Sequence, residues 1–331
     1  MTFSALVSRK SKDGAVTSAV EAVGDDELPA GDVTVEIEWA GFNYKDALVL
    51  AGRGGLVKTY PHVGGIDFAG RVIESDDSRY RAGQGVILTG WRVGELRWGG
   101  FARRARVEAD MLVPLPKSLS TRDAMVLGTA GLTAMLAINR LKSDGLSTDG
   151  GEVLVTGAGG GVGSIAVLLL SRLGHQVVAV SGRSALAEPL EKLGASGVVG
   201  RDAVITQSGK ALDKEQWAGA IDNVGGPMLA ELLKKIARDG GVAAVGNAGG
   251  VGFEGSVLPF ILRGVSLFGI DSVMQPYEAR MAAWDRLSSL FVPAAYAGWV
   301  EEIGLADLPK TADRILKGGV RGRVIVDPRR P

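Results

Sequence analysis

The first third of the chain alternates short apolar runs with turns that contain glycine and proline. Apolar or alternating runs of strand length occur at residues 3–8, 32–40, 70–74, 85–88 and 101–107. The turn Pro29-Ala30-Gly31-Asp32 precedes the second of these runs. Many short strands separated by glycine-rich turns are typical of antiparallel barrels. The pattern therefore predicts a compact, partly closed antiparallel β-barrel in this part of the chain.

The pattern changes near Ser120. Ser120-Thr121-Arg122-Asp123 has the form of a helix N-cap with an acid in the first turn, and it predicts a helix over 124–141. Strands are then expected at 152–156, 176–180, 197–199, 218–222, 241–245 and 265–270, and helices at 162–173, 185–193, 204–212 and 226–237. Alternating strands and helices predict the α/β class, with a doubly wound parallel sheet of six strands. After a helical segment beyond Tyr277, a last strand at 322–327 is expected to return to the first domain.

Residues 152–183 contain the most specific motif. A buried strand leads into a glycine turn at 157–161, a helix begins near Val162, and a second buried strand follows. This order is typical of a dinucleotide-binding βαβ unit, in which the turn approaches a pyrophosphate and the helix offers free N–H groups. We expect cofactor contacts from Gly159, Gly160, Gly161 and Val162. The alternative is a tight turn with no ligand.

The end of the second strand of this motif indicates which cofactor is bound. A site for NAD usually has Asp or Glu there, which accepts hydrogen bonds from the ribose hydroxyls. Here the chain has Ser181, Gly182 and Arg183, and a hydroxyl with a guanidinium suits a 2′-phosphate. Arg201, after the third strand, is placed to share that phosphate. The sequence therefore predicts NADP(H), the alternative being that Arg183 only caps a solvated loop.

Composition argues against several classes of function. The 331 residues suffice for two domains, and 37 basic against 37 acidic residues give no sign of a nucleic-acid or membrane-surface partner. With no cysteine and only His62 and His175, a thiolate zinc site is excluded, and we expect no metal. The first residues lack the apolar segment of a signal peptide, and the longest apolar run, 165–170, is too short to cross a bilayer. We expect a cytoplasmic protein.

Several motifs agree in order and spacing with one superfamily. They are Gly-Phe-Asn-Tyr-Lys-Asp at 41–46, Gly-Ile-Asp-Phe-Ala-Gly at 65–70, Gly-Gly-Phe-Ala at 99–102, Gly-Thr-Ala-Gly-Leu-Thr-Ala at 128–134, the glycine turn at 157–163 and Gly-Arg-Val at 322–324. With them the chain resembles the zinc-independent, quinone oxidoreductase-like medium-chain dehydrogenase/reductase superfamily. The resemblance implies a discontinuous GroES-like catalytic domain at 1–120 and 278–331, an NADP-binding Rossmann domain at 121–277, and a homodimer.

Within that superfamily the chain is similar to the bacterial acryloyl-CoA reductases. The closer match is carried by Phe-Asn-Tyr-Lys-Asp-Ala-Leu, Pro-His-Val-Gly-Gly-Ile-Asp-Phe-Ala-Gly, Val-Ser-Gly-Arg and Leu-Pro-Phe-Ile-Leu-Arg-Gly. It implies NADPH-dependent reduction of the 2,3-double bond of acryloyl-CoA to propanoyl-CoA. A conjugated thioester accepts hydride at its β-carbon because the charge moves onto the thioester oxygen as an enolate, and no metal is needed. Quinone or enone reduction by the same fold is one alternative, and an NADPH-binding protein without turnover is another.

Tyr44 is the strongest candidate near the chemistry. It follows Asn43 in a predicted loop after a strand, where its phenol can contact the nicotinamide ribose or the substrate carbonyl. The alternative is an aromatic ring that closes the barrel edge. Asp67 is a second catalytic candidate, although anchoring a loop through backbone N–H groups fits it equally well. Asn43 and the pair Lys45-Asp46 have the same ambiguity, and the pair is alternatively just solvated.

Further cofactor contacts are implied mainly by the resemblance. Asn247, Ile261 and Ser272 are expected in loops at the carboxyl edge of the parallel sheet, where the nicotinamide half of the cofactor binds. Arg323, in the last Gly-Arg-Val, is expected near the cofactor. Thr129 and Thr133 lie on the helix that leads into the nucleotide domain, where ordinary helix packing is the favoured interpretation.

Residues 91–106 are rich in cations and aromatic rings. These are Trp91, Arg92, Arg97, Trp98, Arg103, Arg104 and Arg106. Such side chains suit the phosphates and the adenine of a CoA ester. A strand with one solvated face has the same composition, and this interpretation is favoured for most of them. His62 and His175 are expected to be structural.

Overall fold

The computed structural model describes residues 1–206 and 208–330, which fall into two compact units. The barrel unit comprises Met1–Thr129, Ser272–Ser289 and Ala297–Pro331, and the parallel-sheet unit comprises Ala130–Asp271 and Leu290–Tyr296. The chain thus leaves the barrel unit at Thr129 and re-enters it at Ser272.

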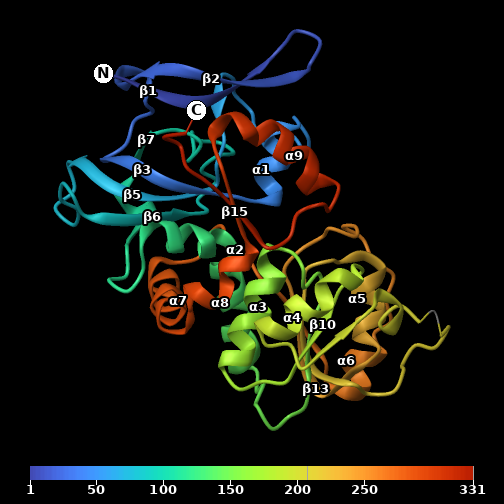
Figure 1. Ribbon diagram of the computed structural model, residues 1–331. Coiled ribbons are helices and arrows are strands. Elements are labelled where there is room, and N and C mark those ends of the chain that lie inside the picture. The colour runs from blue at the N-terminus through green and yellow to red at the C-terminus, as the bar shows by residue number, and fades with distance from the viewer. Residues whose placement is uncertain (207, 331) are drawn as a thin grey trace. The chain divides into compact units, whose positions relative to one another are not determined.

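The parallel-sheet unit is built on one six-stranded sheet (Figure 1). Its spatial order is β11 (Gly197–Val199), β10 (Val177–Val180), β9 (Val153–Val155), β12 (Trp217–Asp222), β13 (Ile236–Ala244) and β14 (Ser266–Gly269). Every neighbouring pair is parallel. Numbered from β9, this order is 3-2-1-4-5-6, the doubly wound arrangement, and the predicted fold class is confirmed.

Helices cover both faces of this sheet. α3 (Gly161–Arg172) and α4 (Ala187–Leu193) lie on one side, and α5 (Gly226–Leu233) and α6 (Leu258–Arg263) lie on the other (Figure 1). The chain moves from β9 to β10 and β11 in one direction along the sheet and from β12 to β13 and β14 in the other. Because the crossovers are right-handed, the helices of the two halves lie on opposite faces. α3 forms because its apolar residues from Ile165 to Leu170 are all buried.

Two predicted helices of this unit differ from the structure. The predicted helix at 204–212 is wrong, since a single 3₁₀ turn, Arg201–Ala203, stands just before that range. Residue 207 lies outside the described residues. Lys235 explains the early end of the turn, because its ammonium donates to the carbonyls of Ala203 and Val204 at 3.0 and 2.9 Å. The predicted helix 226–237 ends at Leu233, since β13 already begins at Ile236.

The barrel unit contains two sheets. The larger has the order β15 (Val300–Ile303), β16 (Arg323–Val326), β3 (Val33–Phe42), β5 (Asp67–Ser75), β6 (Gly85–Thr89) and β8 (Leu112–Pro114), and β7 (Arg104–Val107) also pairs with β3. The smaller has the order β2 (Val16–Gly24), β1 (Thr2–Lys10) and β4 (His62–Val63). β16 pairs antiparallel with β3, so the predicted return of the last strand to the first domain is confirmed.

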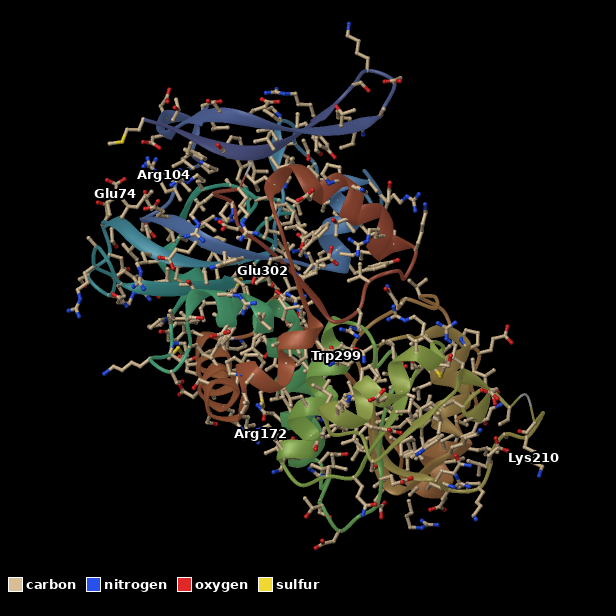
Figure 2. All side chains as sticks on the ribbon, viewed as in Figure 1. Glu74, Arg104, Arg172, Lys210, Trp299 and Glu302 are labelled. Atoms are coloured by element: carbon tan, nitrogen blue, oxygen red, sulfur yellow. The ribbon has the colours of Figure 1, made fainter. Side chains whose placement is uncertain are left out.

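Side chains join these sheets into one core. The rings of Phe42 and Phe101 meet edge to face at 5.6 Å between centroids. The carbonyl of Phe101 accepts a hydrogen bond from the Leu6 amide at 2.8 Å, and the strand predicted from residue 101 begins only at Arg104. Figure 2 shows Glu74 and Arg104 at one end of this unit, in an outer layer that mixes both charges.

Helices complete the barrel unit. α1 (Tyr44–Leu50) packs beside α9 (Leu308–Leu316), as Figure 1 shows in blue and red. α7 (Tyr277–Leu290) confirms the helical segment expected after Tyr277. α8 (Pro293–Tyr296) belongs to the parallel-sheet unit, where the Tyr296 hydroxyl lies 2.6 Å from that of Ser164 on α3.

α2 (Thr121–Ser143) is interrupted at Gly128, whose φ of 47° and ψ of −149° are not helical. The division between the units falls one residue later. By length and composition alone α2 could cross a membrane, yet 78% of its most apolar window is buried inside the protein. A mostly buried core helix passes the same test, so α2 gives only weak evidence for a membrane span.

Candidate functional site

Two buried carboxylates lie beneath the start of α1 in the barrel unit. Asp46 and Asp67 are both fully buried. One oxygen of Asp46 accepts from the Ile66 amide at 2.9 Å, and the other accepts from the backbone and side-chain amides of Asn43 at 2.9 and 3.2 Å. Burial, together with the charge of Asp67, raises the pKa of Asp46 to about 7. Lys45-Asp46 is therefore not a solvated pair.

Asn43 joins these carboxylates to a buried cation. Its side-chain amide donates to Asp67 at 3.1 Å, and its carbonyl oxygen accepts from the Arg323 guanidinium at 2.9 Å. Arg323 is 3% exposed and also donates to the Val126 carbonyl at 3.0 Å. Asn43 therefore fixes the start of α1 relative to β5 and β16.

Asp67 also fixes the break in α2. Its second oxygen accepts from the Thr129 amide at 2.6 Å. A Cβ added to Gly128, whose φ is +47°, would lie 2.6 Å from the same carboxylate. Only glycine meets both requirements there. Both oxygens of Asp67 are thus occupied by protein groups, which is the anchoring role that the sequence left open.

Tyr44 is the first residue of α1 and not part of a loop, so its predicted setting is wrong. Asn43 is the N-cap of this helix and Asp46 completes a capping box, which explains why seven residues suffice to form it. The Tyr44 side chain is 44% exposed, and its hydroxyl has no hydrogen-bond partner within 1–206 and 208–330. It is therefore open to a ligand.

A strained segment follows β6 of the larger sheet. Gly90, Trp91 and Arg92 have φ values of 79°, 55° and 57°, three left-handed residues in succession. Thr89, which precedes them, is the cross-strand partner of Asp67. Non-glycine residues in this region cost about 1–3 kcal/mol each and persist only where the surroundings enforce them.

Arg280 enforces that conformation. It is 1% exposed, donates to the carbonyls of Thr89 and Val273 at 2.6 Å each, and places its guanidinium 4.5 Å from the centre of the Trp91 ring. The Ser272 carbonyl accepts a further bond from Arg280 at 3.4 Å, which places predicted Ser272 beside this cluster. Sequence reasoning missed Arg280, because nothing in its helical surroundings marks it.

The glycine turn of the parallel-sheet unit is shaped to receive a phosphate. It runs from β9 through Gly160, the N-cap of α3, so that α3 begins with Gly161 and Val162. A Cβ on Gly163 would lie 2.8 Å from the Ala158 Cα. Gly163 therefore lets the start of α3 lie against the backbone of the turn, and the first amides of this twelve-residue helix offer an anion site.

Two guanidinium groups flank the end of β10. The Arg183 side chain reaches back to the Gly159 carbonyl at 3.4 Å, and the Ser181 hydroxyl accepts from the Arg183 amide at 3.1 Å. A Cβ on Gly182 would lie 3.0 Å from Arg201 Nε. The structure thus brings Ser181, Gly182, Arg183 and Arg201 together, as a 2′-phosphate site requires.

A third buried carboxylate lies at the carboxyl ends of β9 and β12. Asp222 is fully buried, and it accepts from the Thr156 hydroxyl at 2.6 Å and the Gly225 amide at 2.8 Å. Burial raises the pKa of Asp222. Asn223 donates to the Thr156 carbonyl at 2.7 Å, while its own buried oxygen has no partner in the described chain. Sequence reasoning missed this cluster, although Asp222 closes a predicted strand.

The remaining predicted cofactor residues are spread over both units. Asn247 lies beside Gly225, in the loop after β13, at the same edge as Asp222. Ile261 is not in a loop, since it is a residue of α6 with 68% exposure. α6 ends shortly after Ile261, at the C-cap Gly264, whose φ is +63°.

The histidines do not form a metal site. His62 is buried, and its Nε2 lies 3.0 Å from the Gly94 carbonyl. His175 is 5% exposed, and burial lowers the pKa of both rings. Within the described ranges, 1–206 and 208–330, no three His, Cys, Asp or Glu side chains are grouped to hold a metal ion.

Two family models match the chain, one in its first third and one in its second half. Residues 29–117 match the Alcohol dehydrogenase GroES-like domain family, and residues 161–289 match the family described as Zinc-binding dehydrogenase. Acrylyl-CoA reductase AcuI of Ruegeria pomeroyi is 50% identical, over 98% of this chain and 99% of its own length. The chain belongs to the medium-chain dehydrogenase/reductase family. With no cysteine in the sequence, this family member lacks the thiolates of a zinc site.

Solved structures of other family members carry bound cofactors. The yhdH oxidoreductase of Salmonella enterica, in complex with NADP, is 48% identical and superposes with a TM-score of 0.95 over 98% of this chain and 99% of its own. The Bacillus subtilis protein yhfP, with NAD bound, is 46% identical with a TM-score of 0.94 over 99% of each chain. Its curated name is "Putative quinone oxidoreductase YhfP". The predicted superfamily is confirmed.

Proposed function

We propose that the chain catalyses NADPH-dependent reduction of the 2,3-double bond of acryloyl-CoA to propanoyl-CoA. The observation that carries this proposal is the 50% identity with Acrylyl-CoA reductase AcuI over nearly the whole of both chains. The glycine turn before α3 and the paired guanidiniums of Arg183 and Arg201 support NADP(H) as the cofactor.

The residues present fit that cofactor. The backbone at Gly159, Gly160, Gly161 and Val162 would hold the pyrophosphate, and Ser181, Gly182, Arg183 and Arg201 the adenosine 2′-phosphate. Tyr44, Asn247, Ile261, Ser272 and Arg323 are proposed for the nicotinamide half. Bound NADPH supplies the hydride for the β-carbon of the substrate.

The chain's own residues position the reactants. The network of Asn43, Asp46, Asp67 and Arg323 fixes the first turn of α1, which presents the Tyr44 phenol. Such positioning counts because displacements near 1 Å cost about a hundredfold in rate. We propose Tyr44 as a ligand contact and Asp67 as a positioning residue, because both Asp67 oxygens are occupied and buried.

The test is direct. The purified chain is mixed with acryloyl-CoA and NADPH, cofactor oxidation is followed by absorbance, and propanoyl-CoA is identified by mass spectrometry. Turnover that survives exhaustive chelation is expected, since no metal enters the proposal. NADPH binding without turnover of any enoyl thioester would identify the non-catalytic alternative. Loss of activity that added zinc restores would overturn the metal-free proposal.

Quinone reduction is the second candidate. It is favoured by the name of the Bacillus subtilis relative and by the NAD bound in its structure. The two candidates are separated by comparing acryloyl-CoA with a benzoquinone, each with NADPH and with NADH. A higher kcat/KM for the quinone would select the second candidate.

We further propose a cytoplasmic homodimer that pairs β14 with its copy. β14 is an edge strand with an unpaired side, and Ile261 and Leu262 on the preceding helix are 68% and 52% exposed. The assignment of catalytic and nucleotide domains to 1–120 with 278–331 and to 121–277 also remains a proposal. Light scattering that gives the mass of one chain would contradict the dimer.

A further inference from the structure

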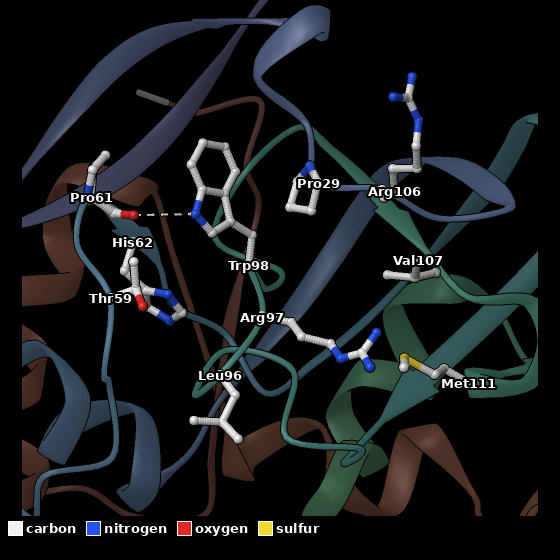
Figure 3. Close-up of a pocket in the computed structure, with 11 residues that line it drawn as sticks. Pro29, Thr59, Pro61, His62, Leu96, Arg97, Trp98, Arg106, Val107 and Met111 are labelled. Carbon is white, nitrogen blue, oxygen red and sulfur yellow. Dashed lines mark hydrogen bonds between the residues drawn. The ribbon is translucent and has the colours of Figure 1, made fainter.

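The barrel unit contains a pocket of about 280 Å³ that none of the proposed site residues lines. Thr59, Pro61 and His62 form one wall, while Leu96, Arg97 and Trp98 project from the turn opposite (Figure 3). The Trp98 indole donates to the Pro61 carbonyl at 3.3 Å, which holds its ring at the pocket. Arg106 lines the pocket from β7.

Six of the seven cations and aromatic rings of residues 91–106 fall into three groups in the structure, Arg92 being the exception. Trp91 stacks on Arg280 and does not line this pocket. Arg103 and Arg104 pair with Glu36 and Asp25 on the strand surface, at 3.2 and 2.7 Å. The third group is the pocket group, Arg97, Trp98 and Arg106. An aromatic ring and two guanidiniums that line the same pocket suit an adenine with phosphates.

A part-buried ion pair connects this pocket to the residue beside Tyr44. Lys45 Nζ lies 2.9 Å from Glu95, which is 8% exposed. Leu96, the next residue, is 50% exposed and already lines the pocket. Three residues of extended chain span at most about 11 Å, so the turn from Glu95 to Trp98 is short. The pantetheine arm of coenzyme A is longer than that span.

We propose that this pocket binds the 3′-phospho-ADP end of the CoA thioester, with the adenine against Trp98 and the phosphates on Arg97 and Arg106. The pantetheine arm then follows the turn past Leu96 toward Tyr44. This inference rests on the proposed acryloyl-CoA reduction for the identity of the ligand. Under this proposal the CoA part of the substrate gains binding energy in the pocket, away from the double bond that is reduced.

The present partners of the two arginines do not prevent this role. Arg97 pairs with Glu108, and the two side chains are 46% and 50% exposed. Arg106 donates to Thr34 at 3.1 Å and lies 3.6 Å from Glu74, whose side chain is 67% exposed. Such exposed pairs contribute about 0–1 kcal/mol. A phosphate with two negative charges replaces them at little cost.

The test compares two substrates that share the reacting group. Acryloyl-CoA carries the 3′-phospho-ADP, and acryloyl-pantetheine lacks it. The double variant Arg97→Gln/Arg106→Gln and the single variant Trp98→Leu are each expected to raise KM for acryloyl-CoA about tenfold or more. KM for acryloyl-pantetheine and kcat for both substrates should change less than twofold. Arg103→Gln is the matched control, because Arg103 has a similar ion pair outside the pocket.

A binding measurement keeps this inference separate from the proposed reaction. Adenosine 3′,5′-bisphosphate is titrated calorimetrically into the chain saturated with NADP⁺, which occupies the cofactor's own adenosine site. Binding that the pocket variants weaken tenfold and Arg103→Gln leaves unchanged supports the subsite even if acryloyl-CoA is not the substrate. Equal KM changes for both thioesters, or bisphosphate binding that the variants leave unchanged, would overturn it. Absence of turnover in the wild type contradicts only the proposed reaction.

Discussion

Both units bury carboxylates near their candidate sites, but they satisfy them by different means. In the parallel-sheet unit, Asp222 is held by one hydroxyl and by backbone amides of the following loop. In the barrel unit, Asp46 and Asp67 share the side chain of Asn43, which in turn meets Arg323. The partners of Asp222 lie at most 66 positions away in the chain, whereas the second arrangement joins residues up to 280 positions apart.

This difference teaches where each half of the site is vulnerable. The cofactor half depends on backbone geometry, so it tolerates changes that leave glycine positions and the two guanidiniums intact. The barrel half depends on a few side chains that satisfy one another, so removing a single member leaves several buried groups without partners. Four predictions sharpen or break this contrast.

The largest effect is expected from Asn43→Ala. The change leaves two buried carboxylates and Arg323 without their shared partner, and breaking such networks costs about 3–5 kcal/mol. We expect a marked loss of thermal stability and a fall in kcat/KM of about a hundredfold or more. Gln84→Ala, which removes an exposed hydrogen bond in the same unit, is the control. Equal losses in both variants would show that the network has no special role.

Arg183→Ala tests the cofactor half through a side chain. Loss of a charged hydrogen bond to the 2′-phosphate should cost about 1.5–3 kcal/mol, seen as a raised KM for NADPH with little change for NADH. Arg172→Ala is the control, since Arg172 is exposed at the end of α3 (Figure 2). If the wild type used NADH and NADPH equally well, the 2′-phosphate site would be wrong.

Gly163→Ala tests the cofactor half through the backbone. The added Cβ would lie 2.8 Å from the Ala158 Cα, so the glycine turn must shift. Overpacking of this kind costs about 1–3 kcal/mol. We expect weaker NADPH binding, measured by fluorescence titration, without loss of acyl-CoA binding. Gly197→Ala should be silent, because no atom lies within 4 Å of its added Cβ. Unchanged affinity in Gly163→Ala would contradict the backbone cradle.

The last prediction concerns pH and Asp46. An acid whose pKa rises on folding, here to about 7, binds a proton in the folded protein that the unfolded chain has released. The free energy of unfolding should therefore decrease as the pH rises from about 4 to about 7, by up to about 1.4 kcal/mol per pH unit. Asp46→Asn has no such titration. Urea unfolding of both proteins at pH 5 and pH 7 should show a steeper decline in the wild type, and parallel declines would refute this assignment.

The sequence predicts the parallel-sheet unit well because its signals are local. Strand, glycine turn, helix and strand follow one another within residues 152–183, and the structure places Ser181, Gly182 and Arg183 together at the end of β10. The false helix at 204–212 came from apolar spacing alone. That spacing does not show that Lys235, about 30 residues later, donates to the carbonyls of Ala203 and Val204, which a helix would use for its own hydrogen bonds.

The barrel half was less predictable because its contacts are non-local. Asn43, Asp46 and Asp67 were recognised as candidates, but no spacing shows that one amide bridges both carboxylates. α1 was missed because seven residues are too few for a periodic signal, and its stability comes from the capping box. Arg280 could not be predicted because one of its main partners, Thr89, lies 191 positions away in the chain.

The left-handed run at Gly90, Trp91 and Arg92 has an evolutionary consequence. Substituting Arg92 by glycine relieves backbone strain, so a screen for thermal stability should enrich that variant, whereas Trp91→Gly also removes a ring that packs against the barrel core. The same variants lose the ring that Arg280 stacks on or the cation that the turn presents. Selection for a more stable protein and selection for a working one therefore oppose each other at Arg92.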